Sequence, residues 1–155
     1  MSEIERLRSY VQDQWVEGEG EGAELVDPAT GEPMATASTK GIDRKAMLDY
    51  ARRVGGANVR NLTFAQRGEI LASLSGAIRE QRDELLDLAV RNGGNTRSDA
   101  KFDVDGASGT LYFYSGLARS LGDVNHLVDG DPVPMGKETP LQGRHLWTAR
   151  RGAAV

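Results

Sequence analysis

The sequence predicts a mixed α/β fold in which a small antiparallel β meander precedes three helices and two extended arms. Three observations support this prediction. Short β-favouring segments, separated by turns that contain Gly and Pro, occupy the first 38 residues. Apolar residues then recur at three- and four-residue steps, the period of an α-helix, between about residues 43 and 119. Beyond Gly122, three prolines exclude further helix and discourage a central strand.

The predicted meander has strands at residues 10–16, 23–26 and 33–38. Glutamates in the loop 18–22 would suit a metal ion, but the fixed oxygen pattern of a calcium loop is absent, so a solvated hairpin loop is favoured. Residues 27–32 read Asp-Pro-Ala-Thr-Gly-Glu. They predict a turn, because Asp bonds its own backbone, Pro presets φ and Gly accepts a positive φ.

The first helix is expected to begin after Asp43, as its N-cap, and to end at Gly55-Gly56. The dominant helix is expected over 62–89. It opens with Thr63 and Gln66 in the spacing of a capping box.

Residues 91–99 are the most tempting binding segment, because Arg91 and Arg97 flank a glycine pair just before a new helix N-terminus. The favoured interpretation is structural. Asn92-Gly93-Gly94 closes the dominant helix, and Thr96 caps the next one with Asp99 three residues on. Neither the Gly-Lys-Ser/Thr ending nor the G-x-G-x-x-G fingerprint of phosphate-binding loops is present.

The third helix is expected over 98–119. Gly106 and Gly109 each cost about 1 kcal/mol relative to Ala inside a helix, so we expect a neighbouring backbone to approach them closely. The segment from Gly106 is not a nucleophile elbow, because Thr110 stands where that motif requires Gly. Asp103 and Asp105 are two residues apart and point in different directions on a helix, so they do not form a proton-sharing pair.

The tail reads as two extended arms, 127–134 and 144–151, joined by a Gly/Pro loop. His126 and His145 are the only histidines, and no cysteine or carboxylate cluster accompanies them, so a surface role outweighs metal binding. The last residues, 151–155, resemble the start of a buried strand. We therefore expect the fold to continue beyond them.

Composition excludes several functions for these 155 residues. The net charge is −4 with both signs interspersed, which argues against nucleic acid as a partner. No apolar run approaches the roughly 18 residues that span a bilayer, and the acidic N-terminus is no secretory signal, so cytoplasmic location is expected. The chain has no cysteine, and therefore no disulfide and no thiolate chemistry.

Four segments in order resemble the N-terminal part of the aldehyde dehydrogenase superfamily. They are its opening strand, its Asn-Pro-Ala-Thr-Gly-Glu turn (with Asp for Asn here), the start of its long helix and its oligomerisation strand, at residues 10–18, 27–36, 62–67 and 144–155. Within the superfamily, three further segments resemble enzymes of phenylacetate degradation and their relatives in aerobic benzoyl-CoA degradation. These are residues 91–103, 106–111 and 143–146.

The resemblance implies the N-terminal portion of an aldehyde dehydrogenase-like fold. Residues 1–120 would be a layer of the cofactor-binding domain, 121–151 the oligomerisation arms of the bridging domain, and 152–155 the start of the first cofactor-domain strand. It also implies oxidation of a CoA-linked semialdehyde to the acid with NAD or NADP.

In that family a cysteine thiolate attacks the aldehyde, an asparagine stabilises the oxyanion and a glutamate activates the hydrolytic water. This chain has no cysteine, and the other groups follow residue 155 in the family's order. The resemblance therefore assigns no catalytic, cofactor-binding or metal residue here. We expect an inactive piece of such an enzyme, which partners the remainder of that polypeptide and forms a homo-oligomer through residues 121–151.

Two alternatives stay open. In one, the chain is a stand-alone binding or assembly module, whose exposed arm edges pair with another chain. In the other, it binds an anion such as a CoA ester or phosphate through Arg91, Arg97 and the helix start at Thr96.

Overall fold

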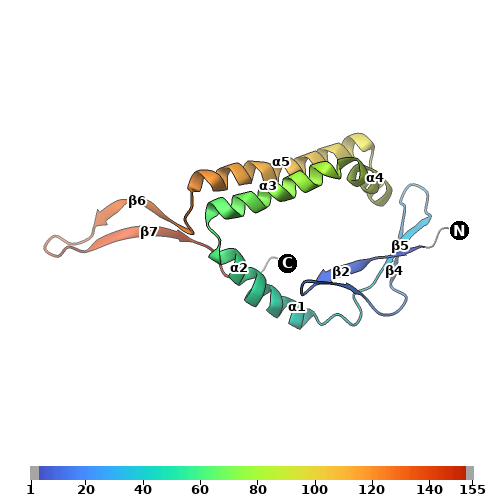
Figure 1. Cartoon of the computed structure of the whole chain (residues 1–155), viewed down its shortest axis with the longest axis horizontal. Coiled ribbons are helices and arrows are strands. Elements are labelled where there is room, and N and C mark those ends of the chain that lie inside the picture. The colour runs from blue at the N-terminus through green and yellow to red at the C-terminus, as the bar shows by residue number, and fades with distance from the viewer. Residues whose placement is uncertain (1–3, 153–155) are drawn as a thin grey trace.

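The strands and helices follow one another in the predicted mixed order, and together they form an elongated molecule (Figure 1). The computed structural model describes residues 4–152. Its elements are β1 (Glu5–Arg6), β2 (Arg8–Val11), β3 (Gln14–Glu17), β4 (Ala23–Val26), β5 (Pro33–Ala37), α1 (Arg44–Tyr50), the π-helix η1 (Ala51–Gly55), α2 (Gly56–Asn61), α3 (Phe64–Glu80), α4 (Arg82–Gly93), α5 (Arg97–Leu121), β6 (His126–Pro134) and β7 (Gln142–Thr148). The α/β class predicted from the sequence is confirmed.

Helices α3 and α5 run side by side in opposite directions (Figure 1). Small residues line their contact: the Ser75 hydroxyl donates to the Ser108 carbonyl at 2.8 Å, and both serines are buried. A Cβ on Gly68 would lie 2.8 Å from the Ser115 carbonyl oxygen, so only glycine fits there. The glycines expected to make this close approach, Gly106 and Gly109, were the wrong ones. Beyond its own helical turn, neither has a described atom within 4 Å of the Cβ position.

The start of α3 confirms the predicted capping box. Thr63 Oγ1 accepts from Gln66 N at 3.2 Å, and Gln66 Oε1 accepts from Thr63 N at 2.9 Å. Two further N–H groups of the first turn bond to the chain that follows α5: Phe64 N to the Val124 carbonyl and Ala65 N to the Gly122 carbonyl. Unpaired donors at a helix start are thereby satisfied, and α3 is tied to the end of α5.

The single helix expected over 62–89 is wrong. The chain leaves the helical path at Gln81, whose φ and ψ are −97° and 14°, and α4 departs from the line of α3 (Figure 1). No Gly or Pro marks this break. The new direction is accompanied by contacts with α5, where Leu86 of α4 and Ala100 of α5 are both fully buried.

The first helix does not end at Gly55-Gly56, as was expected. Both glycines keep right-handed backbone angles, and the chain passes through one π-helical turn into α2, which ends at Asn61. Gly56 is needed for space rather than for a turn: a Cβ there would lie 3.2 Å from the Gly152 carbonyl oxygen. The predicted N-cap is confirmed, since Asp43 accepts from Ala46 N at 2.9 Å.

The strands form separate small sheets instead of one antiparallel meander. β5 pairs antiparallel with β4, as predicted, but parallel with β1, in the order β1-β5-β4. The strand expected over 10–16 is instead a hairpin, because β2 pairs with β3 across Gln12 and Asp13. Both turn residues have positive φ, as a type I′ turn requires, without the Asn-Gly pair that signals one.

The two arms predicted after Gly122 form one antiparallel hairpin, β6–β7, which projects from the helices (Figure 1). Leu127 pairs with Trp147, and the next pair is Val128 with Leu146. Successive residues point to opposite faces of a ribbon, so both faces carry an apolar pair. The cofactor-domain strand expected to begin at 152–155 falls mostly outside the described residues.

Candidate functional site

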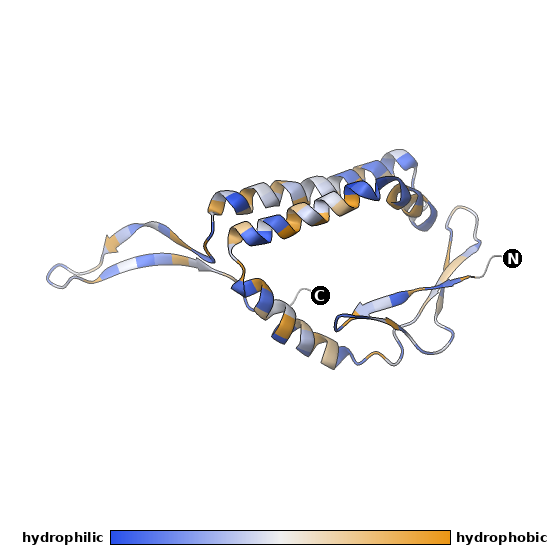
Figure 2. Ribbon diagram, viewed as in Figure 1, coloured by the Kyte–Doolittle hydropathy of each residue, from blue (hydrophilic) through white to orange (hydrophobic). Residues whose placement is uncertain are grey.

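Most large apolar side chains of the described residues are exposed. The buried hydrophobic residues are Ala35, Leu86 and Ala100, whereas Phe102 is 83% and Phe113 65% exposed on α5. Apolar residues also show along α3 and the arms in Figure 2. Exposed apolar side chains that are this numerous are typical of a surface that another segment or chain covers.

One apolar hollow shows the incomplete surface clearly. It has a volume of about 510 Å³, and all its lining residues belong to α5. Tyr112 and Phe113 supply its aromatic wall, while Gly109 and Gly116 leave the helix backbone uncovered. Because α5 alone lines the hollow, another helix or strand could pack against α5 there.

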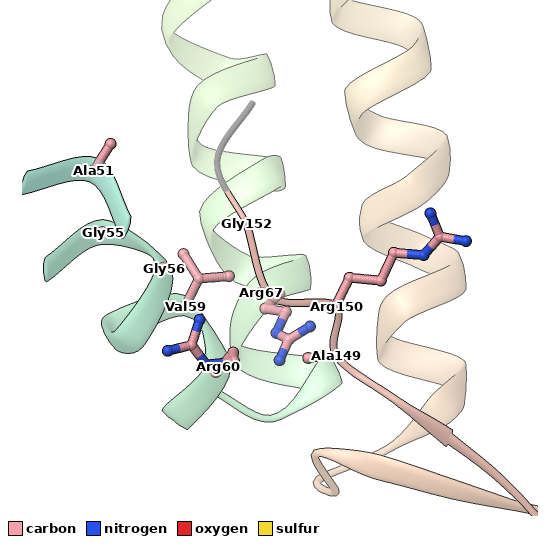
Figure 3. A pocket seen from close by; sticks show the side chains of 9 residues that line it. All are labelled: Ala51, Gly55, Gly56, Val59, Arg60, Arg67, Ala149, Arg150 and Gly152. Atoms are coloured by element: carbon pink, nitrogen blue, oxygen red, sulfur yellow. The ribbon is translucent and has the colours of Figure 1, made fainter. Parts of the chain in front are cut away.

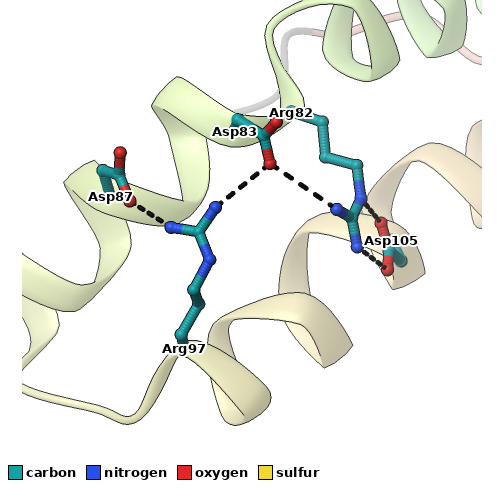
Figure 4. A network of polar contacts seen from close by, with 5 residues as sticks. All are labelled: Arg82, Asp83, Asp87, Arg97 and Asp105. Atoms are coloured by element: carbon teal, nitrogen blue, oxygen red, sulfur yellow. Dashed lines mark hydrogen bonds and ion pairs between the residues drawn. The ribbon is translucent and has the colours of Figure 1, made fainter.

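The segment 91–99, considered above as a binding segment, joins helix α4 to helix α5. Gly94 closes α4 in the left-handed conformation, with φ of 66°, and Thr96 caps α5 by accepting from Asp99 N at 3.2 Å. Both caps were predicted. Arg97 binds the Asp83 and Asp87 carboxylates of α4 (Figure 4). Its guanidinium is therefore already engaged, which contradicts an anion site that depends on Arg97.

A second arginine of this network joins α4 to α5. Arg82 contacts both Asp105 oxygens (Figure 4), at 2.6 Å from Nε and 2.8 Å from Nη2. The hydrogen bond from Arg82 lowers the pKa of the Asp105 carboxyl below its ordinary value, and the same bond raises the pKa of Arg82. The partner of Asp105 in the described residues is thus Arg82 and not Asp103. The pairing of Asp105 was missed because its partner lies 23 positions away.

The loop 18–22, considered for a metal, wraps an arginine of β1. Arg6 donates to the carbonyls of Gly18 and Glu21 and forms an ion pair with Glu17 at 2.8 Å. Its guanidinium supplies the positive charge at this loop. Within residues 4–152, no group of three or more His, Cys, Asp or Glu could hold a metal ion.

Both histidines lie exposed on the hairpin, His126 on β6 and His145 on β7. His126 Nδ1 lies 3.0 Å from the Asn125 side-chain oxygen, and the Trp147 indole donates to Asp129 at 3.0 Å. These local contacts fit the surface role expected for the histidines. In the part of the chain that the structure describes, no helix is long and apolar enough to cross a membrane.

A pocket that the sequence did not suggest lies between α2, the start of α3 and the segment after β7 (Figure 3). Its volume is about 430 Å³. Arg60 and Arg67 line it together with residues of η1 and α2 and, from the segment after β7, Ala149, Arg150 and Gly152. The pocket brings together residues about 90 positions apart. No short-range pattern could have indicated it.

The comparisons with known proteins identify the family. The model of the aldehyde dehydrogenase family matches residues 15–142. The chain belongs to the aldehyde dehydrogenase family. Among curated relatives, it is 41% identical over 150 residues to a 3,4-dehydroadipyl-CoA semialdehyde dehydrogenase of Aromatoleum evansii, covering 97% of this chain and 29% of that protein. A betaine aldehyde dehydrogenase of Bacillus subtilis is 27% identical over 81% of this chain and 26% of its own length.

Solved aldehyde dehydrogenases share the fold. Lactaldehyde dehydrogenase from Escherichia coli aligns with a TM-score of 0.70 at 20% identity, over 88% of this chain and 27% of that one. Betaine aldehyde dehydrogenase from Staphylococcus aureus, in complex with NAD+, aligns with a TM-score of 0.67 at 22% identity, over 82% and 25%. This aldehyde dehydrogenase chain thus spans between a quarter and a third of the proteins it matches.

Proposed function

We propose that this chain forms the N-terminal layer of an NAD(P)-dependent aldehyde dehydrogenase that oxidises a CoA-linked semialdehyde to the acid in phenylacetate or benzoate degradation. The observation that carries the proposal is the 41% identity to the 3,4-dehydroadipyl-CoA semialdehyde dehydrogenase, which extends over 97% of the chain. A succinate-semialdehyde dehydrogenase of Schizosaccharomyces pombe is 29% identical over 76%. The identity to the CoA-semialdehyde dehydrogenase, 41%, is higher than the 29% identity to the succinate-semialdehyde dehydrogenase, which favours a CoA-linked substrate.

The proposal divides the chain by function. Residues 1–120 are a layer of the cofactor-binding domain, and residues 121–151 are arms through which subunits pair in a cytoplasmic homo-oligomer. The one-walled hollow on α5 supports the first assignment, because an opposing element of the same polypeptide would complete it. The apolar pairs on both faces of β6–β7 support the second.

The chain's own residues do not fit a nicotinamide cofactor or the family's nucleophile. There is no cysteine and no G-x-G-x-x-G segment after a strand in these 155 residues. In this proposal the thiolate, the cofactor site and the water-activating carboxylate belong to other residues of the enzyme. This chain alone neither binds NAD(P) nor oxidises aldehydes, and its contribution is to support and cover the catalytic layer.

A chimera tests the proposal. The segment of the Aromatoleum evansii enzyme that aligns with this chain over 150 residues would be replaced by this chain. We expect the chimera to form NAD(P)H from 3,4-dehydroadipyl-CoA semialdehyde. A matched chimera carries the corresponding segment of the Bacillus subtilis betaine aldehyde dehydrogenase. It shows whether the enzyme stays active with any segment of the family at this place. A folded but inactive first chimera would contradict the proposal.

A non-catalytic assembly module derived from the same fold is the second candidate, favoured by the exposed hairpin β6–β7. Size-exclusion chromatography with light scattering on this chain separates the two functions. A stable oligomer that this chain forms alone, and that Leu146→Asp disrupts, supports the module, because the arms of an enzyme layer would pair subunits only within the complete enzyme. A chain that forms no defined oligomer on its own supports the enzyme layer.

A further inference from the structure

The pocket of Figure 3 is lined by cations without any acidic residue. Arg60, Arg67 and Arg150 contribute to its wall, and no Asp or Glu does. The guanidinium groups of Arg60 and Arg67 lie beside the pocket, whereas the Arg150 side chain extends away from it (Figure 3). Within residues 4–152, neither Arg60 nor Arg67 forms an ion pair. This contrasts with Arg82 and Arg97, which both bind carboxylates.

Arg67 is held in place at the pocket. Its Nη2 donates to the Leu62 carbonyl at 3.2 Å, and its guanidinium lies 5.5 Å from the centre of the Phe64 ring. Its Nε is buried and has no hydrogen-bond partner among the residues that the structure describes. A fixed guanidinium loses little conformational freedom when it binds an oxyanion, which favours binding.

Gly56 makes room for the second arginine. A Cβ at this position would lie 3.1 Å from Arg60 Nη1 and 3.2 Å from the Gly152 carbonyl oxygen. The glycine therefore allows the segment after β7 to pass close to α2 while Arg60 stays at the pocket. Two half-buried arginines thus line one cavity, and no carboxylate lines it with them. An anion in the cavity would supply the opposite charge that the lining lacks.

We propose that this pocket binds a phosphate group, as carried by a CoA thioester. Guanidinium groups bind phosphate through paired N–H donors, and a charge-assisted bond of this kind is about twice as strong as a neutral one. The volume of about 430 Å³ exceeds that of one phosphate and leaves space for the neighbouring part of a larger ligand. The choice of CoA rests on the proposed function, whereas the phosphate chemistry rests on Arg60 and Arg67 alone.

Calorimetry on this chain, with inorganic phosphate, CoA and the phosphate-free pantetheine at constant ionic strength, tests the proposal. We expect phosphate and CoA to bind and pantetheine not to bind. Arg60→Gln should weaken the binding of phosphate and of CoA by about tenfold, the loss expected for one charged hydrogen bond. Arg44→Gln is the matched control, because Arg44 is an exposed arginine of α1 outside this pocket, and it should leave binding unchanged.

Arg60→Gln is the decisive variant, because Arg60 forms no hydrogen bond in the described structure that its loss would break. Arg67→Gln also removes the bond to Leu62 and the contact with Phe64, so its fold must be checked by circular dichroism. A flat titration at about 10 mM phosphate, or equal binding by Arg60→Gln, overturns the site. Phosphate binding beside an inactive chimera would support the site and contradict only the proposed function.

Discussion

Arg82, the first residue of α4, donates two parallel hydrogen bonds to Asp105 in the middle of α5, at 2.6 and 2.8 Å. This contact links the segment after the Gln81 break to the neighbouring helix. We predict that Asp105→Asn lowers the thermal midpoint of unfolding, because a bidentate ion pair becomes a weaker neutral contact. Thermal unfolding followed by circular dichroism measures the change. Asp103→Asn, on the same helix but without an ion pair in residues 4–152, should leave the midpoint unchanged.

The same pair predicts a pH dependence. Arg82 lowers the pKa of the folded Asp105 below 3.8, its ordinary value. The stabilisation is therefore complete above about pH 3.8 and is lost as the pH falls through the lower folded pKa. The difference in midpoint between wild type and Asp105→Asn should disappear at low pH. Since the Arg82 and Asp105 side chains are 35% and 50% exposed, 1 M salt should also reduce the difference, and an unchanged difference would contradict the ion-pair interpretation.

Gly68 and Gly109 predict opposite results for the same substitution. Gly68→Ala places a Cβ 2.8 Å from the Ser115 carbonyl oxygen, so α3 and α5 must separate, at a cost of about 1–3 kcal/mol. Gly109→Ala meets no atom within 4 Å and should stabilise this chain by up to about 1 kcal/mol, through better helix propensity. Urea unfolding of both variants is the measurement. Equal effects would contradict the assigned helix contact.

The capping box predicts a modest and specific effect. Thr63→Ala removes the acceptor for Gln66 N and should destabilise the chain by about 1 kcal/mol. Thr63→Ser keeps the hydroxyl and should restore most of the loss. Urea unfolding of the two variants checks this. A Ser variant as unstable as the Ala variant would show that the methyl group, not the hydroxyl, matters.

Features set by neighbouring residues could be predicted from the sequence. The caps at Asp43, Thr63 and Thr96 depend on a side chain and an N–H three positions on, and all three are present. The turn at Asp27 is equally local: its carboxylate accepts from Ala29 N at 2.8 Å. Residues this close in sequence come into contact in almost any fold, so these caps and this turn can be predicted without knowing the tertiary structure.

Features that depend on residues far apart in the sequence could not be predicted. Nothing near Gln81 marks a break, because the ion pairs that accompany the new direction of α4 come from α5. The Gly55-Gly56 pair looks like a helix end, but Gly56 serves a chain crossing almost 100 positions away. The pocket of Arg60 and Arg67 depends on the same crossing. Arg97 was recognised as a candidate, but its partners Asp83 and Asp87 lie on the preceding helix.

The rate of NAD(P)H formation by the chimera with the Aromatoleum evansii enzyme tests the central proposal most directly. If this chain is the supporting layer of a CoA-semialdehyde dehydrogenase, kcat/KM for 3,4-dehydroadipyl-CoA semialdehyde should stay within about tenfold of the parent, a loss of about 1.4 kcal/mol or less in transition-state stabilisation. The betaine aldehyde dehydrogenase chimera should fall well below it. A folded chimera that performs no better than this control would contradict the account.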